Sequence, residues 1–215
     1  MTDQADSYFE TRLPYDRRRH VLWQVLARHV FQAYAPPNGT VLELGAGYCD
    51  FINAIEAPRK YALDVWPGMA GYAGPGVKTI IGDVTAMDCL AEASVDLIFA
   101  SNLFEHLDKE TLATCLRLAR RKLRRNGRLI ALQPNYRYAY REYFDDFTHV
   151  SIWSHVSLSD YLQAQGFTIE RVSPRFLPLT IKSALPVMPI LIRAYLASPI
   201  KPMAKQMLLV ARATG

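Results

Sequence analysis

The stretch that most constrains the fold runs from Thr40 to Phe51 and reads TVLELGAGYCDF. Its apolar run, VLEL, is typical of a buried strand, and the run ends at a glycine turn, Gly45 to Gly47. Helical spacing follows from Cys49 into the sequence FINAIEA. Such a strand, glycine turn and helix bring the free N–H groups of a helix N-terminus close to a ligand, which suits a nucleotide-like molecule.

Two acidic residues distinguish this turn from a dinucleotide fingerprint. Asp50 stands where Gly-x-Gly-x-x-Gly has its third glycine, and Glu43 lies on the strand just before the turn. The pattern Glu-x-Gly-x-Gly resembles the first motif of the class I S-adenosylmethionine (SAM) dependent methyltransferases. The resemblance implies SAM contacts from Glu43, Gly45, Ala46 and Gly47, with Glu43 at the methionine end. Cys49 replaces a glycine found in many members, and an ordinary tight turn stays open as the alternative.

Two more acids follow at the ends of predicted strands. Asp64 follows the strand 61–63 at close to the roughly 20-residue spacing of a ribose-binding acid. Asp83 follows the strand 77–81 and resembles the family's second motif, in which an acid holds the adenine amino group. The resemblance adds backbone contacts at Val65 and Val84. The alternatives are a helix N-cap at Asp64 and an Asx-turn at Asp83. In a doubly wound sheet these strand ends line one crevice.

The fourth predicted strand, 93–100, leads into the sequence SNLFEHL, which resembles the family's fourth motif. The resemblance places Ser101 and Asn102 beside the cofactor, and Glu105 and His106 beside the methyl group and the acceptor. An amphipathic helix is predicted from Asp108 to a left-handed cap at Asn126-Gly127, before a fifth strand at 128–133. Its predicted buried side comprises Leu112, Cys115, Leu116, Leu118, Ala119 and Leu123.

The period is lost between Pro134 and His155, where aromatic and acidic residues are frequent. A long irregular stretch rich in aromatic residues indicates a binding loop, although a packed surface loop is an equal alternative. We expect acceptor contacts from Tyr136, Tyr140, Tyr143, Asp145, Asp146 and Trp153. His106 and His149 are the candidate catalytic bases, because histidine titrates near neutrality. A metal held by Asp145, Asp146, His149 and His106 is the minor alternative, so we expect no metal ion.

Helical spacing also predicts a helix from about Tyr8 to Tyr34. The resemblance implies that residues 1–36 form a lid over the SAM pocket, so that Tyr8, Arg12 and Tyr15 reach the bound molecules, with Tyr15 contacting the acceptor. A packing helix with a solvated arginine face is the alternative.

The C-terminal part is predicted to hold a helix opened by a capping box at 157–160 and ended by Gly166, then two last strands, near 166–172 and 206–213. The family's last strand is antiparallel to the others, and here a helical insert, 174–205, precedes it. Residues 183–200 of the insert are apolar with basic flanks. Three interpretations stay open for them: core or pocket wall, homodimer contact, and peripheral membrane contact.

The chain has 215 residues, which fits one domain, 1–215, of the Rossmann-like class I fold with a seven-stranded, mostly parallel sheet. Three scattered cysteines, Cys49, Cys89 and Cys115, and a polar N-terminus favour a cytoplasmic protein, with peripheral membrane contact as an option. The net charge of +5 is modest, and we do not infer nucleic-acid binding. The resemblance implies SAM-dependent methylation of a small polar acceptor. The YFDDFTHVS loop and the PRFLPLTIKS stretch resemble bacterial methyltransferases found with glycan-assembly enzymes, and this resemblance favours a hydroxyl of a sugar or lipid-linked glycan. The alternatives are a nicotinamide-dependent oxidoreductase and a non-catalytic SAM-binding protein.

Overall fold

The protein is built around one seven-stranded sheet with the order β3-β2-β1-β4-β5-β7-β6. The computed structural model describes residues 11–179 and 187–214. The strands are β1 (Thr40–Leu44), β2 (Arg59–Asp64), β3 (Val77–Ile81), β4 (Val95–Ser101), β5 (Leu123–Pro134), β6 (Phe167–Pro178) and β7 (Ala204–Ala213). Strands β1 to β5 pair in parallel, whereas β7 is antiparallel to both β5 and β6. The predicted doubly wound sheet with an antiparallel last strand is therefore confirmed.

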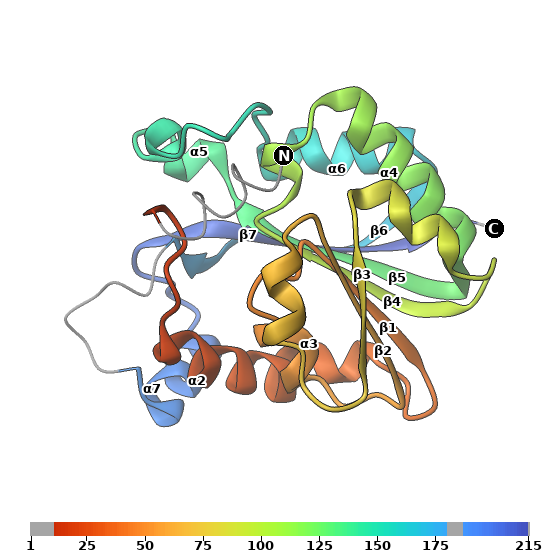
Figure 1. Ribbon diagram of the computed structural model, residues 1–215. Coiled ribbons are helices and arrows are strands. Elements are labelled where there is room, and N and C mark those ends of the chain that lie inside the picture. Colours follow the sequence, from red (N-terminus) through yellow and green to blue (C-terminus); the bar gives the residue numbers. More distant parts are fainter. Residues whose placement is uncertain (1–10, 180–186, 215) are drawn as a thin grey trace.

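Helices cover both faces of this sheet (Figure 1). Helices α4 (Lys109–Lys122) and α6 (His155–Ala164) lie on one face, and α2 (Arg17–Leu26) and α3 (Asp50–Ala54) lie on the other. Helix α5 (Tyr136–Ala139) follows β5, and α7 (Pro189–Ala197) contacts α2. The remaining helical turns are η1 (Ala27–Phe31), η2 (Gln32–Tyr34), η3 (Pro67–Gly71), η4 (Val84–Cys89), η5 (Phe104–His106) and η6 (Tyr143–Asp145).

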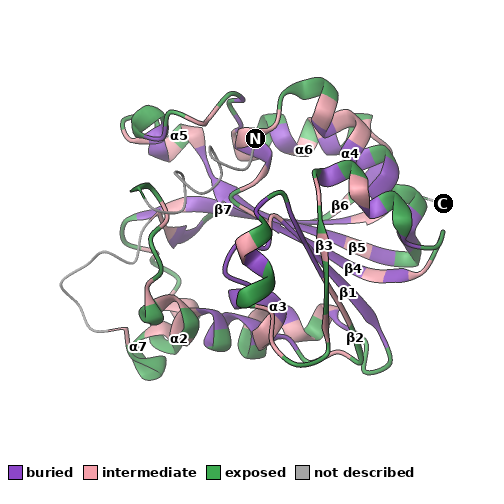
Figure 2. Cartoon of the chain, in the orientation of Figure 1, coloured by how far each residue is buried: buried purple, intermediate pink, exposed green. Residues whose placement is uncertain are grey.

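Two apolar cores flank the sheet, in which β1, β4, β5 and β7 are largely buried and the outer strands β3 and β6 are more exposed (Figure 2). The core under α2 and α3 is aromatic, with the rings of Phe51 and Phe99 stacked at 3.8 Å and Phe31 against both. The core under α4 and α6 is mainly aliphatic. It contains the predicted apolar face of α4, and all six predicted residues are buried: Leu112, Cys115, Leu116, Leu118, Ala119 and Leu123.

The N-terminal helix differs from its prediction. The sequence predicts one helix from about Tyr8 to Tyr34, but the backbone is not helical at residues 13–16, and α2 begins only at Arg17. Pro14 lacks an N–H and disfavours helical geometry at Leu13, and Asp16 then caps α2 by accepting the Arg18 N–H at 2.9 Å. Tyr8, which was expected to be in the lid, lies outside the described residues.

Two further helix boundaries also differ from the sequence prediction. Helix α4 ends at Lys122 rather than at Asn126, whose left-handed φ of 68° falls within the β5 segment instead. Helix α6 begins at His155 because the capping box is formed by Ser154 and Ser157, three residues before the predicted one. Periodicity predicted each element, but its ends depend on side-chain contacts that a pattern does not contain.

The insert before the last strand is shorter than predicted. Strand β6 continues to Pro178 and β7 starts at Ala204, so the predicted insert 174–205 shrinks to 179–203. Ser173 of β6 pairs with Leu208 and Leu177 pairs with Gln206, so four steps along β6 correspond to only two steps along β7. The resulting bulge accommodates Pro174 within the strand. No residue of α7 is buried. Within residues 11–179 and 187–214, no helix combines the length and hydrophobicity that a membrane span requires.

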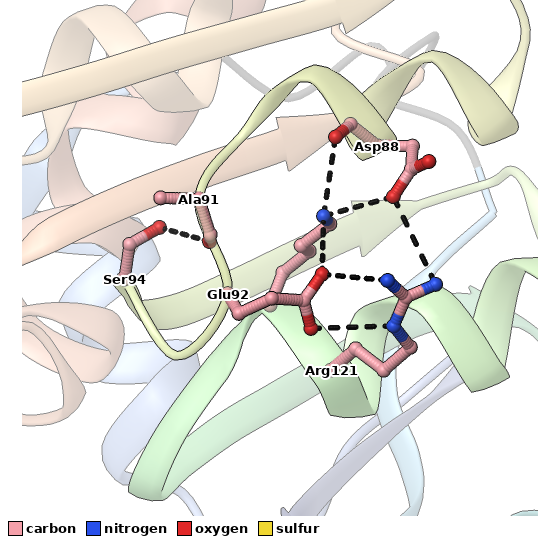
Figure 3. A network of polar contacts seen from close by, with 6 residues as sticks. Asp88, Ala91, Glu92, Ser94 and Arg121 are labelled. Carbon is pink, nitrogen blue, oxygen red and sulfur yellow. Dashed lines mark hydrogen bonds and ion pairs between the residues drawn. The ribbon is translucent and has the colours of Figure 1, made fainter.

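Ion pairs and hydrogen bonds connect the C-terminal end of α4 to η4 and the residues that follow it (Figure 3). The Lys122 side chain is only 2% exposed, and its Nζ lies 2.9 Å from Asp88 Oδ1 and 2.8 Å from Glu92 Oε1. It also donates to the Asp88 carbonyl at 3.1 Å. Desolvation lowers the pKa of Lys122, but the hydrogen bonds to both carboxylates outweigh it and leave the pKa raised. The buried ammonium therefore has three oxygen partners.

Candidate active site

The glycine turn is tied directly to the neighbouring strand. The N–H groups of Gly45 and Ala46 both donate to the Leu63 carbonyl, at 2.9 and 3.1 Å. Gly45 has a φ of +66°, and a Cβ there would lie 3.1 Å from Cδ1 of Leu103. Glycine is needed at this position because its backbone is left-handed and Leu103 packs against it. Cys49, the departure from the family pattern, adopts a left-handed φ of 57° and precedes α3.

The two acids next to the turn are buried and hold it in place. Glu43 is 4% exposed and accepts the Ile52 N–H of α3 at 3.0 Å. Asp64 is 7% exposed and accepts the N–H groups of Gly47 at 2.8 Å and Trp66 at 2.9 Å. Burial raises the pKa of both carboxyls, while these backbone hydrogen bonds oppose the rise. The acids thus order the loop that would surround a ligand.

Asp83 is exposed and makes the Asx-type contacts that the sequence analysis left as an alternative. It accepts the Thr85 N–H at 2.8 Å and the Thr85 hydroxyl at 2.5 Å, and these bonds lower its pKa. Because β3, β2 and β1 are neighbours in the sheet, Asp83, Asp64 and Glu43 lie at three adjacent carboxyl ends. The predicted alignment of the three acids along one edge is therefore present, with Val65 exposed and Val84 buried beside them.

Four aromatic rings gather beside the glycine turn. Tyr48 packs against Tyr15, Trp66 and Tyr72 with ring centroids 5.3, 5.4 and 4.8 Å apart. Arg19 of α2 lies 5.9 Å from the Tyr48 ring centroid. These contacts bring the segment before α2 onto the turn, which is the position predicted for a lid. Tyr15 is 51% exposed, so one side of this cluster meets solvent.

The end of β4 carries polar groups that face β7. Asn102 has a φ of 48°, and its Oδ1 accepts from Gln206 Nε2 at 3.1 Å. Its N–H donates to the Leu132 carbonyl at 2.8 Å, and Ser101 is half-buried beside it. Gln206 was predicted only as a strand residue.

Glu105, His106 and His149 form a polar cluster, which we call the EHH cluster; Glu105 lies four residues beyond the end of β4 and is buried, while both histidines are half-buried. One ligand-type atom from each residue lies within 4.8 Å of the other two. Glu105 is 0% exposed, and among the described residues neither of its carboxyl oxygens has a hydrogen-bond partner. His149 Nδ1 is also buried without a partner in the described part of the chain, and the imidazole rings of His106 and His149 lie 4.8 Å apart. Glu105 and His149 therefore contribute three buried polar atoms that make no hydrogen bond with the described residues.

Burial shifts the pKa of each residue of the EHH cluster in the direction that favours its neutral form. Burial raises the pKa of Glu105 to about 8, with the Asp146 carboxylate adding to the rise. Burial and the neighbouring His149 lower the pKa of His106 to about 4, and burial lowers that of His149. Near pH 7 the cluster holds a protonated carboxyl group and two neutral imidazoles.

Hydrogen bonds fix the tautomer of His106. The Thr148 hydroxyl lies 2.5 Å from Asp146 Oδ1 and 2.9 Å from His106 Nδ1. Because a carboxylate only accepts, Thr148 donates to Asp146, and His106 Nδ1–H donates to the Thr148 oxygen. The lone pair of the neutral imidazole is then on Nε2. Asp146 also pairs with Arg12, with its Oδ2 3.6 Å from Arg12 Nε.

The loop 134–155 divides into residues that support it and residues that face solvent. Tyr143 is 1% exposed and donates to the Ser151 carbonyl at 2.7 Å, and Trp153 is 4% exposed and donates to the Phe104 carbonyl at 3.2 Å. Both were predicted as acceptor contacts, but in this structure they are packed inside the protein. Tyr136 is half-buried, while Tyr140 and Asp145 are exposed. Glu105, also predicted to contact the acceptor, has no exposed surface.

Several residues of the site were missed in the sequence. Tyr48, Trp66, Tyr72 and Arg19 form the aromatic side of the glycine turn, and Thr148 orients His106. Tyr48 and Trp66 had a signal, because each directly follows a predicted cofactor motif, Gly45-Ala46-Gly47 and Asp64-Val65. Thr148 had none, since its partner lies 42 residues away.

Comparison with known proteins agrees with this geometry. Residues 42–131, from β1 to β5, match the family model described as "Methyltransferase domain". No curated protein matches the sequence. The match covers the glycine turn and all three acids, so it favours methyl transfer over the nicotinamide-dependent alternative.

Three solved structures have a similar fold. A SAM-dependent methyltransferase from Archaeoglobus fulgidus has 20% identity and a TM-score of 0.68, covering 97% of this chain and 99% of that one. One from Mesorhizobium loti has 19% identity and a TM-score of 0.61, covering 84% and 94%. Geranyl diphosphate C-methyltransferase from Streptomyces coelicolor, in complex with Mg²⁺, geranyl diphosphate and S-adenosylhomocysteine, has 14% identity and a TM-score of 0.61, covering 89% and 78%. At these identities the similarity establishes the fold alone.

Proposed function

We propose that this protein, an S-adenosylmethionine-dependent methyltransferase, methylates a hydroxyl group of a sugar, a lipid-linked glycan or a similar small polar molecule. The EHH cluster carries the proposal, because it brings proton-accepting groups of η5, just beyond β4, together with His149 of the loop 134–155. A hydroxyl acceptor must lose a proton during methyl transfer, whereas the sulfonium of SAM is already activated. A site for an alcohol therefore needs such groups, and this site has them.

The cofactor is proposed to lie along the carboxyl ends of β1, β2, β3 and β4. Glu43 would act on the methionine ammonium, Asp64 on the ribose hydroxyls and Asp83 on the adenine amino group. The remaining proposed contacts are Gly45, Ala46, Gly47, Val65, Val84, Ser101 and Asn102. Two properties of Asp64 support the proposed ribose contact. Its carboxylate accepts the N–H groups of Gly47 and Trp66 and so orders the loop, and each oxygen keeps a further lone pair that could accept from a ribose hydroxyl.

The acceptor is proposed to bind between the EHH cluster and the loop 134–155. Tyr136, Tyr140 and Asp145 are the loop residues whose exposure allows direct contact, and Tyr15 approaches from the segment before α2. Exposed aromatic rings next to carboxylates are suited to sugars, because rings stack on C–H faces and carboxylates accept from hydroxyls. Tyr143, Trp153 and Asp146 are assigned a supporting role, because each is buried.

His106 is the preferred proton acceptor, with His149 second. Its Nδ1–H is held by Thr148, so Nε2 presents the lone pair. A pKa of about 4 keeps His106 neutral at pH 7, although it makes His106 a weak base. Proton removal would then accompany formation of the new O–CH₃ bond, as the S–CH₃ bond breaks and SAM becomes S-adenosylhomocysteine.

An assay of methyl transfer tests the proposal. The protein is incubated with SAM carrying a labelled methyl group and a panel of free sugars, nucleotide sugars and lipid-linked sugars, with amine and thiol analogues as controls. We expect label in a hydroxyl-containing acceptor, and loss of at least about 100-fold in rate for the His106→Gln variant. Label only in amine or thiol acceptors, or binding of SAM without turnover of any acceptor, would refute O-methylation.

We also propose a domain organisation, a cellular location and a partner for the segment 183–200. We treat residues 1–215 as one cytoplasmic domain whose segment 183–200 meets a membrane surface or a second copy. The described part of this segment includes exposed apolar side chains, among them Ile190 at 65% and Ile200 at 75%. Flotation with anionic vesicles and sedimentation velocity distinguish the two partners.

A further inference from the structure

The EHH cluster has features that neither packing nor a single proton transfer explains. Three side chains from two distant segments, η5 and the loop before Ser151, direct nitrogen and carboxylate atoms to within 4.8 Å of one another. A buried polar atom that makes no hydrogen bond costs about 1–3 kcal/mol of folding free energy. Both Glu105 oxygens and His149 Nδ1 are in this position. From these groups we propose that Glu105, His106 and His149 bind one divalent transition-metal ion.

The orientation of His106 supports this site independently. A metal-binding histidine usually donates its second ring N–H to a carboxylate or carbonyl, which fixes the tautomer. His106 Nδ1–H lies 2.9 Å from the Thr148 hydroxyl, and that hydroxyl is held by Asp146. The same nitrogen lies 3.4 Å from the Thr148 carbonyl. The relay from Asp146 through Thr148 therefore directs the Nε2 lone pair of His106 as a metal ligand requires.

The chemistry of the donors selects the ion. Two imidazole nitrogens and one carboxylate are a set that Zn²⁺ and its neighbours in the first transition row bind, and three protein ligands leave a fourth position open. Mg²⁺ and Ca²⁺ prefer oxygen ligands and bind poorly to imidazole. Ligands around Zn²⁺ at about 2.0–2.1 Å lie roughly 3.3 Å apart, so the three side chains must close by about 1.5 Å at most on binding.

An ion in this position changes how the acceptor loses its proton, a consequence that rests on the proposed O-methylation. Coordination uses the lone pairs with which His106 and His149 would take up a proton. The acceptor hydroxyl would instead occupy the ion's open position, where its pKa falls and it releases its proton to water. The hydroxyl oxygen then attacks the methyl carbon, and the S–CH₃ electron pair stays on sulfur. The metal site itself is independent of which acceptor is methylated.

Titration with Co²⁺, a coloured substitute for Zn²⁺, tests the site directly. Full-length protein without an affinity tag is treated with a chelator, dialysed and titrated while the visible spectrum is recorded. We expect one equivalent of Co²⁺ to bind with the spectrum of nitrogen and oxygen ligation, to be displaced by Zn²⁺, and to persist in excess Mg²⁺. The Glu105→Gln and His149→Asn variants should each bind Co²⁺ at least about tenfold more weakly.

Matched variants separate ligation from general damage. His20→Asn removes an exposed histidine of α2, and Asp145→Asn removes an exposed carboxylate next to Asp146, so neither should change Co²⁺ affinity. Binding of S-adenosylhomocysteine reports that each variant is folded. The proposal is overturned if folded wild-type protein binds no Co²⁺ at millimolar concentration, or if Glu105→Gln and His149→Asn bind as wild type does. Metal binding without methylation of any hydroxyl would refute the proposed function and leave the metal site standing.

Discussion

Two buried polar side chains lie near opposite ends of α4, and they differ in whether their polar atoms have hydrogen-bond partners. At the C-terminal end of the helix, buried Lys122 has three oxygen partners within 3.1 Å, and two of them belong to half-exposed carboxylates (Figure 3). Before the helix starts, Glu105 is buried with no partner for either oxygen. A satisfied network holds elements together, whereas an unsatisfied one lowers stability and persists where function requires it.

The two groups also differ in their effect on pH dependence. Lys122 keeps its charge because the gain from two carboxylates exceeds the loss of solvation. In the described part of the chain no cation offsets the burial of Glu105, and its pKa rises to about 8. The sequence context of each residue is unremarkable, so the contrast arises from the fold. Four substitutions test this contrast between Lys122 and Glu105, and they follow in order of decreasing expected change in stability.

Glu105→Gln should stabilise the protein at alkaline pH. The pKa of Glu105 is about 8 in the folded protein and 4.5 for a glutamate side chain free in water, so its favourable contribution is complete below pH 4.5 and is lost as the pH rises through 8. The variant lacks this loss, and its free energy of unfolding relative to wild type should increase by about 4 kcal/mol between pH 4 and pH 8. Urea unfolding at several pH values measures the difference. Parallel profiles for the two proteins would show that Glu105 is not held neutral. Methyl transfer should fall about 100-fold despite the gain.

Lys122→Ala should destabilise the protein and leave its ligand affinity unchanged. The substitution leaves a cavity under α4 and removes the cation that both carboxylates share, so the free energy of unfolding should fall by about 2 kcal/mol. The affinity for S-adenosylhomocysteine should not change, because the network lies away from the carboxyl ends of the strands. Lys109→Ala, an exposed site on the same helix, is the matched control and should change stability by less than about 0.5 kcal/mol. Equal losses in both variants would argue against a structural role for the network.

Thr148→Val tests the relay that orients His106. It removes the hydroxyl between Asp146 and His106 while keeping the side-chain volume, so stability should fall by about 1 kcal/mol and Co²⁺ should bind about tenfold more weakly. Thr148→Ser keeps the hydroxyl and should restore both properties. Metal affinity that is the same in the Val and Ser variants would exclude the relay as a positioning element. Thermal unfolding and Co²⁺ titration measure the two effects.

Arg121→Ala should have the smallest effect, although Arg121 belongs to the same network as Lys122. Its side chain is 53% exposed, and it pairs with Glu92 at 2.8 Å and Asp88 at 3.9 Å in solvent. Exposed ion pairs contribute little because water and salt screen them. Chemical unfolding should give a free energy equal to wild type within error. A loss as large as that of Lys122→Ala would mean that the surface pairs, rather than the buried ammonium, hold the region together.

The sequence predicted the sheet and the alignment of three acids along one edge of it, because these follow from local patterns. β3 occupies the predicted residues 77–81, and the three acids lie at adjacent strand ends as expected. Regular alternation of apolar runs, glycine turns and helices determines this part of the fold. It does not determine where a strand bulges, so β6 was predicted too short and the insert too long.

The burial of residues in the loop 134–155 could not be predicted from the sequence, because these residues are placed by long-range packing. Tyr143 and Trp153 have the composition of a sugar-binding loop, yet both are buried under their own loop. Glu105 reads as an ordinary polar residue before a helix, and only the folded chain brings His149 to it. Residue types therefore indicated the region, and the separation into supporting and functional residues required the structure.

Calorimetric titration with S-adenosylhomocysteine, on wild type and on Asp64→Ala, tests the central claim most directly. The account predicts micromolar binding to wild type and a loss of at least about tenfold, or 1.4 kcal/mol, in the variant. Circular dichroism confirms that the variant is folded. No binding to wild type, with binding of NAD(H) or NADP(H) instead, would contradict the account.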